Sequence, residues 1–263
     1  YKEWFNYGAG VLNYLSAPEF PMDTRNSKFM DAGGVIMDGN LSSFRQITSW
    51  KDQDFREKVT ENTDFAWYDT DASLHPYEGK SNPKYTETSP EGFSDTDKYT
   101  WCKAPRYDGK PFQVGPLPQI LAQYLAGDAL TKKHVDGALN AAGLEVKHLH
   151  STLGRHVARG IRAAIHAERA LENIALLEQN LATGDQTYAN PVTELPSGTY
   201  RGVGIHEAPR GLLSHWIVIE DKKIKNYQAV VPSTWTAGPK DKAGNASPYE
   251  ASLIGNPIAD PSK

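Results

Sequence analysis

The clearest pattern of apolar positions lies between residues 153 and 177. Apolar side chains recur there at steps of three and four: Leu153, Val157, Ile161, Ala164, Ala167, Leu171, Ile174 and Leu177. Such steps place side chains on one face, so the pattern predicts a helix of about seven turns capped by Ser151 or Thr152. The helix leaves its arginines on other faces: Arg155, Arg159, Arg162 and Arg169. Its glycines, Gly154 and Gly160, admit a neighbouring backbone, which suits a buried bundle.

Four further stretches are typical of helices: residues 1–17, 41–66, 116–126 and 247–255. The first is aromatic and apolar at roughly helical spacing, and we expect it to end before Pro18. The second is expected to be one helix or two, with Asp52 or Asp54 near a start. The third has prolines in its first turn and ends at Gly127.

Two β-branched runs, residues 216–220 and 224–231, predict a hairpin with its turn between them. A hairpin holds its two ends side by side, so we expect the loop of residues 207–210 to lie beside the loop of residues 232–234. Residues 31–39 read as one short strand between turns. These elements indicate an α+β fold: a mainly helical core with long central helices and small β-hairpin or sheet elements.

Composition bounds the class of protein. Hydrophobic residues make up 39% and charged residues 23%, which is typical of a folded globular chain, and the net charge of −4 argues against a nucleic-acid binder. No run approaches the roughly 18 apolar residues of a membrane span, and no signal peptide is seen. The single cysteine, Cys102, excludes a disulfide framework or a multi-cysteine metal site within the chain, and we expect it to serve in packing.

Several polar features have plain structural explanations. Residues 69–100 are rich in Ser, Thr, Pro, Gly, Asp and Tyr, which predicts a long surface excursion with His75 solvated. Lys103-Ala-Pro-Arg106 is by itself typical of a turn with two exposed cations. Gly202-x-Gly204 lacks the third glycine and the helix of a dinucleotide fingerprint. The remaining histidines of the central region are expected to be solvated or to cap helices: His148, His150, His156 and His166.

Two longer motifs change the picture. Residues 202–216 read Gly-x-Gly-x-x-Glu-Ala-Pro-Arg-Gly-x-Leu-x-His-Trp, and residues 227–235 read Tyr-Gln-x-Val-Val-Pro-Ser-Thr-Trp. Together, in this order and at this separation, they resemble the large subunit of nickel-iron hydrogenases, closest in wording to the periplasmic and membrane-associated uptake group. Residues 99–107 and 151–160 match the family less strongly. Three positions depart from its usual wording: Gln119 and Lys240 replace arginine, and Thr236 replaces asparagine.

The resemblance implies heterolytic cleavage of H2 to protons and electrons at a nickel-iron centre whose iron carries carbon monoxide and cyanide. It implies catalytic roles for Arg210 and Pro209, with the Arg210 guanidinium over the open side of the metals, either as a transient base or as a fixed cation. Ser233 and Arg210 would donate hydrogen bonds to cyanide, because an anionic acceptor needs donors. Apolar residues would wall the carbon monoxide: Ala208, Pro209, Leu213, Val231 and Pro232.

The resemblance also implies a magnesium ion, with the backbone carbonyl of Ala229 as a ligand and Lys103 beside the ligands. The cysteines that hold nickel and iron in the family are absent from this chain, so we expect residues 1–263 to be a single truncated domain, without the metal-ligand segments at its two ends and inactive by itself. Expected partners are a small subunit carrying iron-sulfur clusters and an electron acceptor on the cytochrome or quinone side. The export signal travels on the small subunit in this family, which implies a periplasmic or membrane-associated enzyme and leaves the cytoplasm open.

A different class of protein is the alternative. Respiratory complex I contains a relative of this subunit that lacks the metal and helps to shape a quinone site. A cysteine-free scaffold of that kind would fit the lone Cys102. Such relatives have lost the wording Glu-Ala-Pro-Arg-Gly and Pro-Ser-Thr-Trp, which residues 207–211 and 232–235 keep.

Overall fold

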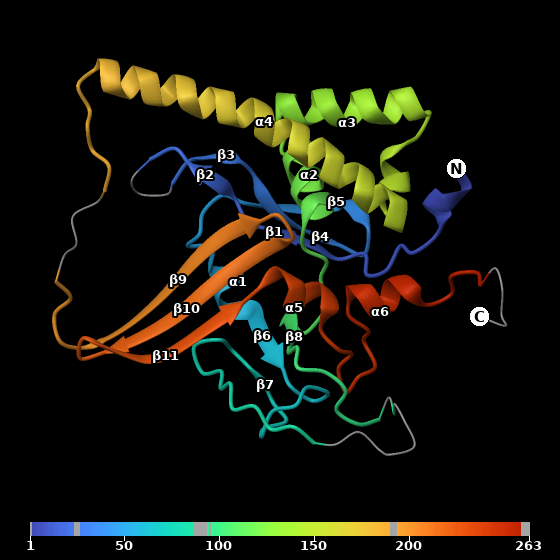
Figure 1. Cartoon of the computed structure of the whole chain (residues 1–263), viewed down its shortest axis with the longest axis vertical. Coiled ribbons are helices and arrows are strands. Elements are labelled where there is room, and N and C mark those ends of the chain that lie inside the picture. Colours follow the sequence, from blue (N-terminus) through green and yellow to red (C-terminus); the bar gives the residue numbers. More distant parts are fainter. Residues whose placement is uncertain (1, 24–26, 87–93, 95, 190–193, 259–263) are drawn as a thin grey trace.

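Three long antiparallel strands cross the middle of the molecule (Figure 1). A computed structural model describes residues 2–23, 27–86, 94, 96–189 and 194–258. The long strands are β9 (Thr199–Ala208), β10 (Gly211–Glu220) and β11 (Lys223–Val230), and β10 is in the centre of their sheet. A helical layer lies on one side of this sheet, and a smaller sheet with short helices lies on the other.

The predicted hairpin is confirmed as β10 and β11. Asp221 and Lys222 make its turn with positive φ values of 48° and 66°, and the register shifts by a bulge between Val218 and Ile219. Of the loop expected at residues 207–210, Glu207 and Ala208 instead belong to β9, which pairs with β10 along its whole length from Thr199 to Ala208. The site motif therefore begins in a strand and turns only at its end.

The short strands form three further sheets. β4 (Gly33–Met37) lies between β1 (Tyr14–Ser16) and β5 (Asn40–Ile47), and β2 (Glu19–Pro21) pairs with β3 (Phe29–Asp31). The third sheet places β6 (Val59–Asn62) between β7 (Ser73–Leu74) and β8 (Ala104–Tyr107).

These strands correct two predictions and confirm a third. Residues 1–17 are not a long helix: a short 3₁₀ helix, η1 (Lys2–Asn6), precedes β1. Residues 41–66 contain β5, one short helix and β6 rather than a helix pair, because their apolar side chains pack on sheet faces. The short strand predicted within residues 31–39 is confirmed as β4.

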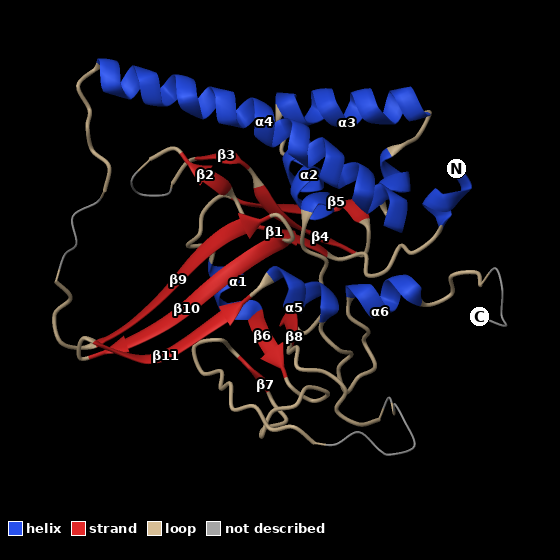
Figure 2. Cartoon of the chain, viewed as in Figure 1, coloured by secondary structure: helices blue, strands red, loops and turns tan. Residues whose placement is uncertain are grey.

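The helices lie mainly on one side of the molecule (Figure 2). α2 (Pro116–Leu125), α3 (Ala129–Ala142) and α4 (Thr152–Ala182) pack together, with the 3₁₀ helix η2 (Val146–Leu149) leading into α4. On the other side are α1 (Gln53–Lys58), α5 (Pro232–Ala237) and α6 (Pro248–Leu253). Asp52 caps α1 by accepting from the amide of Phe55, and Gly127 follows α2, so the helix starts and stops predicted at these places are confirmed.

The predicted long helix is confirmed as α4, but only its first half is buried. Ser151 caps it by accepting a hydrogen bond from the amide of Gly154 at 2.9 Å. Beyond Arg169 its apolar positions are 54–69% exposed: Leu171, Ile174, Leu177 and Leu181. Figure 1 shows this half of α4 extending past α3 and the sheets. A close backbone approach occurs at Gly154, where a Cβ would lie 2.3 Å from the Leu149 carbonyl oxygen, but not at Gly160.

The arginines of α4 do not simply decorate its outer faces. Arg162 and Arg169 are buried, and both contact the carboxylate of Asp31, at 2.7 and 3.2 Å. Arg169 also bonds Asp128 at 2.7 Å. A buried charge needs such partners, and Asp31 lies about 130 residues earlier in the chain, so periodicity could not reveal the pairing.

Two hydrophobic clusters fill the molecule. One packs the three long strands against β6, β8 and α1 and is centred on Trp216, Phe55 and Trp235. The other lies under the helices, around Ile120 and Ile165. The α+β class is confirmed, but the mainly helical core is supported only in part, because half of the core is built on strands.

The surface excursion predicted for residues 69–100 is supported only in part: Ser73–Leu74 form β7 and Tyr77 packs in the core, while residues 87–93 and 95 lie outside the described part of the chain. His75 is not solvated, however: its Nε2 lies 2.7 Å from the Arg56 carbonyl oxygen, and its Nδ1 accepts from the amide of Tyr77 at 3.1 Å. No helix in the described part of the chain is long and apolar enough to span a membrane.

Candidate functional site

The Pro-Arg-Gly sequence forms the two-residue turn between β9 and β10. Ala208 pairs with Gly211, which leaves Pro209 and Arg210 at the turn. Gly211 has a φ of 123°, and a Cβ there would lie 2.4 Å from the backbone nitrogen of Gly115. The turn therefore needs glycine at this position, because it packs backbone to backbone against the start of α2.

A side chain from α4 also holds this turn. The Arg159 guanidinium donates to the Pro209 carbonyl oxygen at 2.9 Å. One turn earlier on α4, Arg155 donates to the carbonyl oxygens of Gly8 and Ala9 at 2.8 and 3.3 Å, and burial lowers its pKa. The backbone that carries Arg210 is thus fixed by the Gly115 contact and by Arg159.

Arg210 itself faces a hollow of about 750 Å³. α4 contributes Arg155, His156 and Arg159 to the walls, and α5 contributes Thr236. Residues at the start of α2 and in α6 complete the lining. Arg210 is exposed and makes no ion pair within the described part of the chain. A cation presented into a concave space by a fixed backbone is suited to hold an anionic ligand.

Of the predicted ligand-wall residues, Pro209 lines the hollow with Arg210, whereas the others lie around this end of the sheet without lining it. Ala208 and Leu213 are half-buried in β9 and β10, Val231 precedes α5, and Pro232 is buried at its first position. Ser233 is exposed in α5, and its hydroxyl has no hydrogen-bond partner among the described residues. We expected residues 207–210 to lie beside residues 232–234. The structure supports this only coarsely, because Arg210 and Thr236, two residues beyond the second segment, line the same hollow.

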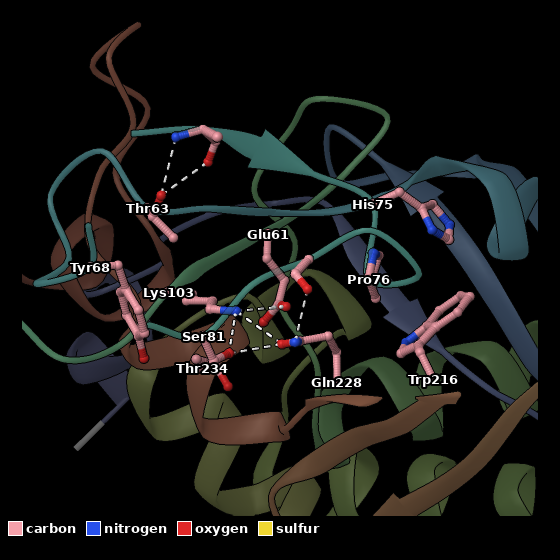
Figure 3. Close-up of polar contacts among 12 residues, drawn as sticks. Glu61, Thr63, Tyr68, His75, Pro76, Ser81, Lys103, Trp216, Gln228 and Thr234 are labelled. Carbon is pink, nitrogen blue, oxygen red and sulfur yellow. Dashed lines mark hydrogen bonds and ion pairs between the residues drawn. The ribbon is translucent and has the colours of Figure 1, made fainter. Parts of the chain in front are cut away.

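Lys103 lies at a second centre, beside Gln228 of β11 (Figure 3). It is 6% exposed, and its Nζ donates to Ser81 Oγ at 2.9 Å and to Gln228 Oε1 at 3.1 Å. Glu61 Oε2 is 3.4 Å away and makes a buried ion pair with it. Burial raises the pKa of Glu61, and Lys103 opposes the rise.

This cluster abuts Ala229, because Gln228 is its neighbour on β11 and donates its amide to the Gly79 carbonyl oxygen at 3.0 Å. Ala229 is exposed and pairs with His215. The cluster thus brings a cation, a carboxylate and an amide together beside the predicted magnesium ligand.

The turn of two exposed cations expected at residues 103–106 is wrong. The segment leads into β8, and Arg106 is 2% exposed. Its Nε donates to Asp241 Oδ2 at 2.9 Å, and its other nitrogens donate to Ser247 and to backbone carbonyls. Arg106 therefore fixes the loop between α5 and α6 to β8. Cys102 is half-buried.

A buried carboxyl, Glu207, lies three residues before Arg210. Its Oε1 accepts from the Ala17 amide at 2.7 Å, and its Oε2 accepts from the Gln119 side chain. Glu19 bonds the Glu207 amide and lies 3.0 Å from His206 Nδ1. Burial raises the pKa of Glu207 to about 8, although the hydrogen bonds and Arg162 lower it.

No group of three or more histidine, cysteine, aspartate or glutamate side chains in the described ranges is arranged to hold a metal ion. The hollow is lined by the guanidinium groups of Arg155, Arg159 and Arg210, together with the hydroxyl of Thr236 and the imidazole of His156. A guanidinium group only donates hydrogen bonds, so it binds anions rather than metals. The residues present therefore fit the surroundings of a centre that carries anionic ligands, but not the direct ligands of nickel and iron.

Sequence reasoning missed Glu61, Ser81, Gln228 and Glu207 as site residues. Glu61 was hidden in a stretch that we expected to be helical. Gln228 and Glu207 lie inside the two motifs, and their presence there was the signal that could have identified them. Ser81 lies in the long excursion, where no periodic pattern indicates which side chains face inward.

Comparisons with known proteins agree with the motifs. A protein-family model described as nickel-dependent hydrogenase matches residues 1–263. The hydrogenase-2 large chain of Escherichia coli K12 is 41% identical over 269 residues, covering 100% of this chain and 47% of that protein. The quinone-reactive Ni/Fe-hydrogenase large chain of Wolinella succinogenes is 37% identical, covering 96% of this chain and 44% of its own length.

Solved structures agree as well. The chain is similar to the [NiFeSe]-hydrogenase of Dm. baculatum, with a TM-score of 0.69, 29% identity, and coverage of 99% of this chain and 49% of that one. A Ni-Fe-Se hydrogenase from D. vulgaris Hildenborough gives the same TM-score at 27% identity. The chain spans about half the length of the relatives that it matches.

Proposed function

Since the chain belongs to the nickel-dependent hydrogenase family, we propose that it forms the part of a hydrogenase large subunit that surrounds the metal centre, in an enzyme that cleaves H2 into protons and electrons. The observation that carries this proposal is the fixed turn that presents Arg210 to a hollow of about 750 Å³. A nickel-iron centre, held by cysteines outside this chain, supplies the metal chemistry when bound.

The chain's own residues order the surroundings of that centre. Arg210 presents five N–H donors in a planar fork, which suits an anionic ligand such as cyanide. The turn is fixed by Gly115, Gly211 and Arg159, so the backbone from which the guanidinium extends needs little reorganisation when charge develops nearby. Ser233 is proposed as a second donor to cyanide, and Pro209 with Ala208, Leu213, Val231 and Pro232 is proposed as the apolar wall for carbon monoxide.

We also propose a magnesium ion beside the Lys103 cluster, with the Ala229 carbonyl as a ligand. An oxygen ligand suits this hard cation. Magnesium usually keeps several of its waters, and Glu61 offers an acceptor for such waters, while Lys103 balances the carboxylate. The buried contacts among Lys103, Glu61, Ser81 and Gln228 support this arrangement.

The proposal includes a small subunit with iron-sulfur clusters as the electron outlet. The names of the relatives describe uptake and quinone-reactive hydrogenases, which supports electron delivery toward a quinone or cytochrome. A periplasmic or membrane-associated location, reached through the small subunit, is proposed on the same basis.

Metal analysis combined with hydrogen-dependent dye reduction tests the function. The full-length protein that carries this chain is purified with its small subunit, and nickel and iron are measured on the same sample. We expect one nickel per large subunit and dye reduction that requires H2. Stoichiometric protein without nickel and without H2-dependent reduction would contradict the proposal and favour the metal-free scaffold.

A further inference from the structure

A second hollow, of about 580 Å³, lies far from Arg210. Arg201 lines it near the opposite end of β9, about 24 Å along the strand from Ala208 at the usual rise per residue. Lys51, just before α1, and Arg56, in the last turn of α1, line the same hollow. Its lining shares no residue with the hollow at Arg210 or with the Lys103 cluster.

The three cations of this hollow have no anionic partner. Within the described part of the chain, no carboxylate lies within 4.0 Å of Lys51, Arg56 or Arg201. Two acidic residues, Glu57 and Glu78, also line the hollow, but Glu57 accepts from Gln53 at 2.9 Å instead. Three cations held on one concave surface repel one another, so an anion between them would be stabilised.

Two residues that line this hollow, Arg56 and Tyr77, also carry an enclosed polar atom without a partner. The Nε of Arg56 and the hydroxyl of Tyr77 make no hydrogen bond within the described part of the chain. Tyr77 is only 9% exposed. A buried donor without an acceptor costs about 1–3 kcal/mol, so a shift of these side chains that lets a ligand oxygen reach them would restore a lost bond.

Tyr77 belongs to an aromatic cluster. His75 stacks on Tyr77 with ring centroids 4.9 Å apart, and both meet Trp216 edge to face. Figure 3 shows His75 and Trp216 facing each other. A carbonyl only accepts and an amide N–H only donates, so the bonds to Arg56 O and from Tyr77 N give His75 a hydrogen on Nε2 alone. Both ring nitrogens of His75 are thus engaged with backbone atoms, which leaves the anion to the three cations.

An adjoining hollow of about 240 Å³ shares the three cations and adds apolar surface. Trp50 and Val203 line it, and Trp50 is held by its own bond to the Pro18 carbonyl oxygen at 2.9 Å. The main hollow falls within the usual range for small-molecule sites, roughly 300–1,000 Å³, which is larger than a bare inorganic ion needs.

From these contacts we propose that the hollow between α1, Tyr77 and the start of β9 binds a small organic oxyanion. Its phosphate or carboxylate group lies between Lys51, Arg56 and Arg201 and accepts from Arg56 Nε and the Tyr77 hydroxyl. Its carbon body lies toward Trp50 and Val203. Phosphate and carboxylate share the paired acceptor oxygens that a guanidinium recognises.

Calorimetric titration of the full-length protein separates the two chemistries. Inorganic phosphate and citrate are the probes at about 0.15 M ionic strength, where exposed charges are screened. We expect saturable binding of at least one probe. The preferred probe identifies the ligand group, and citrate binding more tightly than phosphate indicates that the carbon body contributes.

Three variants make the test specific. Arg56→Gln should weaken binding by at least about tenfold, and Tyr77→Phe by about threefold to tenfold. Tyr77→Phe should leave thermal stability unchanged or higher, because the removed hydroxyl has no partner in the free protein. Lys223→Gln, which removes an exposed charge outside the hollow, should bind like the unaltered protein.

Three results would overturn the proposal: no binding of either probe; a loss in Lys223→Gln equal to that in Arg56→Gln; or unchanged affinity in Tyr77→Phe. If neither probe binds and Arg56→Gln or Arg201→Gln instead weakens association with the small subunit, the cations serve a protein contact. Each readout is independent of hydrogenase activity.

Discussion

The side-chain amide of Gln119 donates a hydrogen bond to Glu207, a carboxyl buried beneath the turn that carries Arg210. No cation forms an ion pair with Glu207 within the described part of the chain. The nearest influences come from Arg162, which lowers its pKa, and from Glu19, which raises it. Position 119 departs from the usual family wording, and its contact is now assigned: a neutral amide, rather than a charge, faces Glu207.

The first prediction concerns pH. Burial raises the pKa of Glu207 from an ordinary value of 4.5 to about 8. Between these values the folded chain holds a proton that the unfolded chain has lost. The stabilisation is complete below pH 4.5 and disappears as pH rises through 8, with a slope of at most about 1.4 kcal/mol per pH unit. Thermal denaturation of the full-length protein from pH 5 to 8 should show this decline.

Glu207→Gln should flatten that decline, because an amide has the shape of the protonated carboxyl and does not titrate. Gln119→Arg should also reduce it by placing a cation beside the carboxylate. Glu178→Gln, which changes an exposed glutamate on α4, is the control and should keep the pH dependence. A decline that survives in Glu207→Gln would show that another group causes it.

The second prediction tests the packing of the turn. Gly211→Ala forces a side chain into φ 123° and places its Cβ 2.4 Å from Gly115 N. We expect the free energy of unfolding to fall by at least about 2 kcal/mol. Gly204→Ala, on the same strand with no atom within 4 Å of its Cβ, should change it by less than about 1 kcal/mol. Equal effects in denaturant unfolding would show that the Gly115 contact is not decisive.

The third prediction concerns the buried pair of Lys103 and Glu61. Lys103→Met leaves the carboxylate without its cation and should cost about 3–5 kcal/mol of unfolding free energy. The double variant Lys103→Met with Glu61→Gln removes both charges and should recover at least about 1 kcal/mol. Denaturant titration of both variants measures this coupling. A double variant as unstable as the single one would mean that the unpaired carboxylate is not the cause.

The fourth prediction concerns Ser233. In the complete enzyme, Ser233→Ala should shift the infrared bands of cyanide more than the band of carbon monoxide, because only cyanide loses a donor. Thr234→Ala is a useful control, since the Thr234 hydroxyl donates to the Val231 carbonyl oxygen at 2.9 Å and is already engaged. A carbon monoxide band that moves most in Ser233→Ala would contradict the placement of Ser233.

Local signals predicted the elements whose stabilising contacts are close in sequence. The caps Asp52 and Ser151, and the hairpin turn at residues 221–223, depend on neighbours a few positions away. The motif around Arg210 could be recognised from its wording. Its backbone could not, because the turn depends on Gly115, almost a hundred residues earlier.

The failed predictions involve partners that are distant in the chain. β1 is buried on both sides, so residues 14–16 show no alternation to mark them as a strand. Arg106 is charged and lies outside any apolar pattern, so the sequence gives no sign that it is buried. Its burial depends on its contacts with Asp241 and Ser247, which are distant in the chain. The exposed half of α4 has the same periodicity as the buried half, since periodicity records which face is apolar but not whether anything covers it.

Turnover of the Arg210→Lys enzyme, measured with its metal content, tests the central claim most directly. Lysine keeps the positive charge but loses the planar fork that the fixed turn presents. Hydrogen oxidation and nickel are measured on the same heterodimer preparation, with Lys223→Arg, a charge-conserving change at an exposed residue of β11, as the control. The account predicts a loss of at least about a hundredfold in turnover with nickel unchanged, and a normal control. Near-normal turnover of Arg210→Lys, or loss of its nickel, would contradict it.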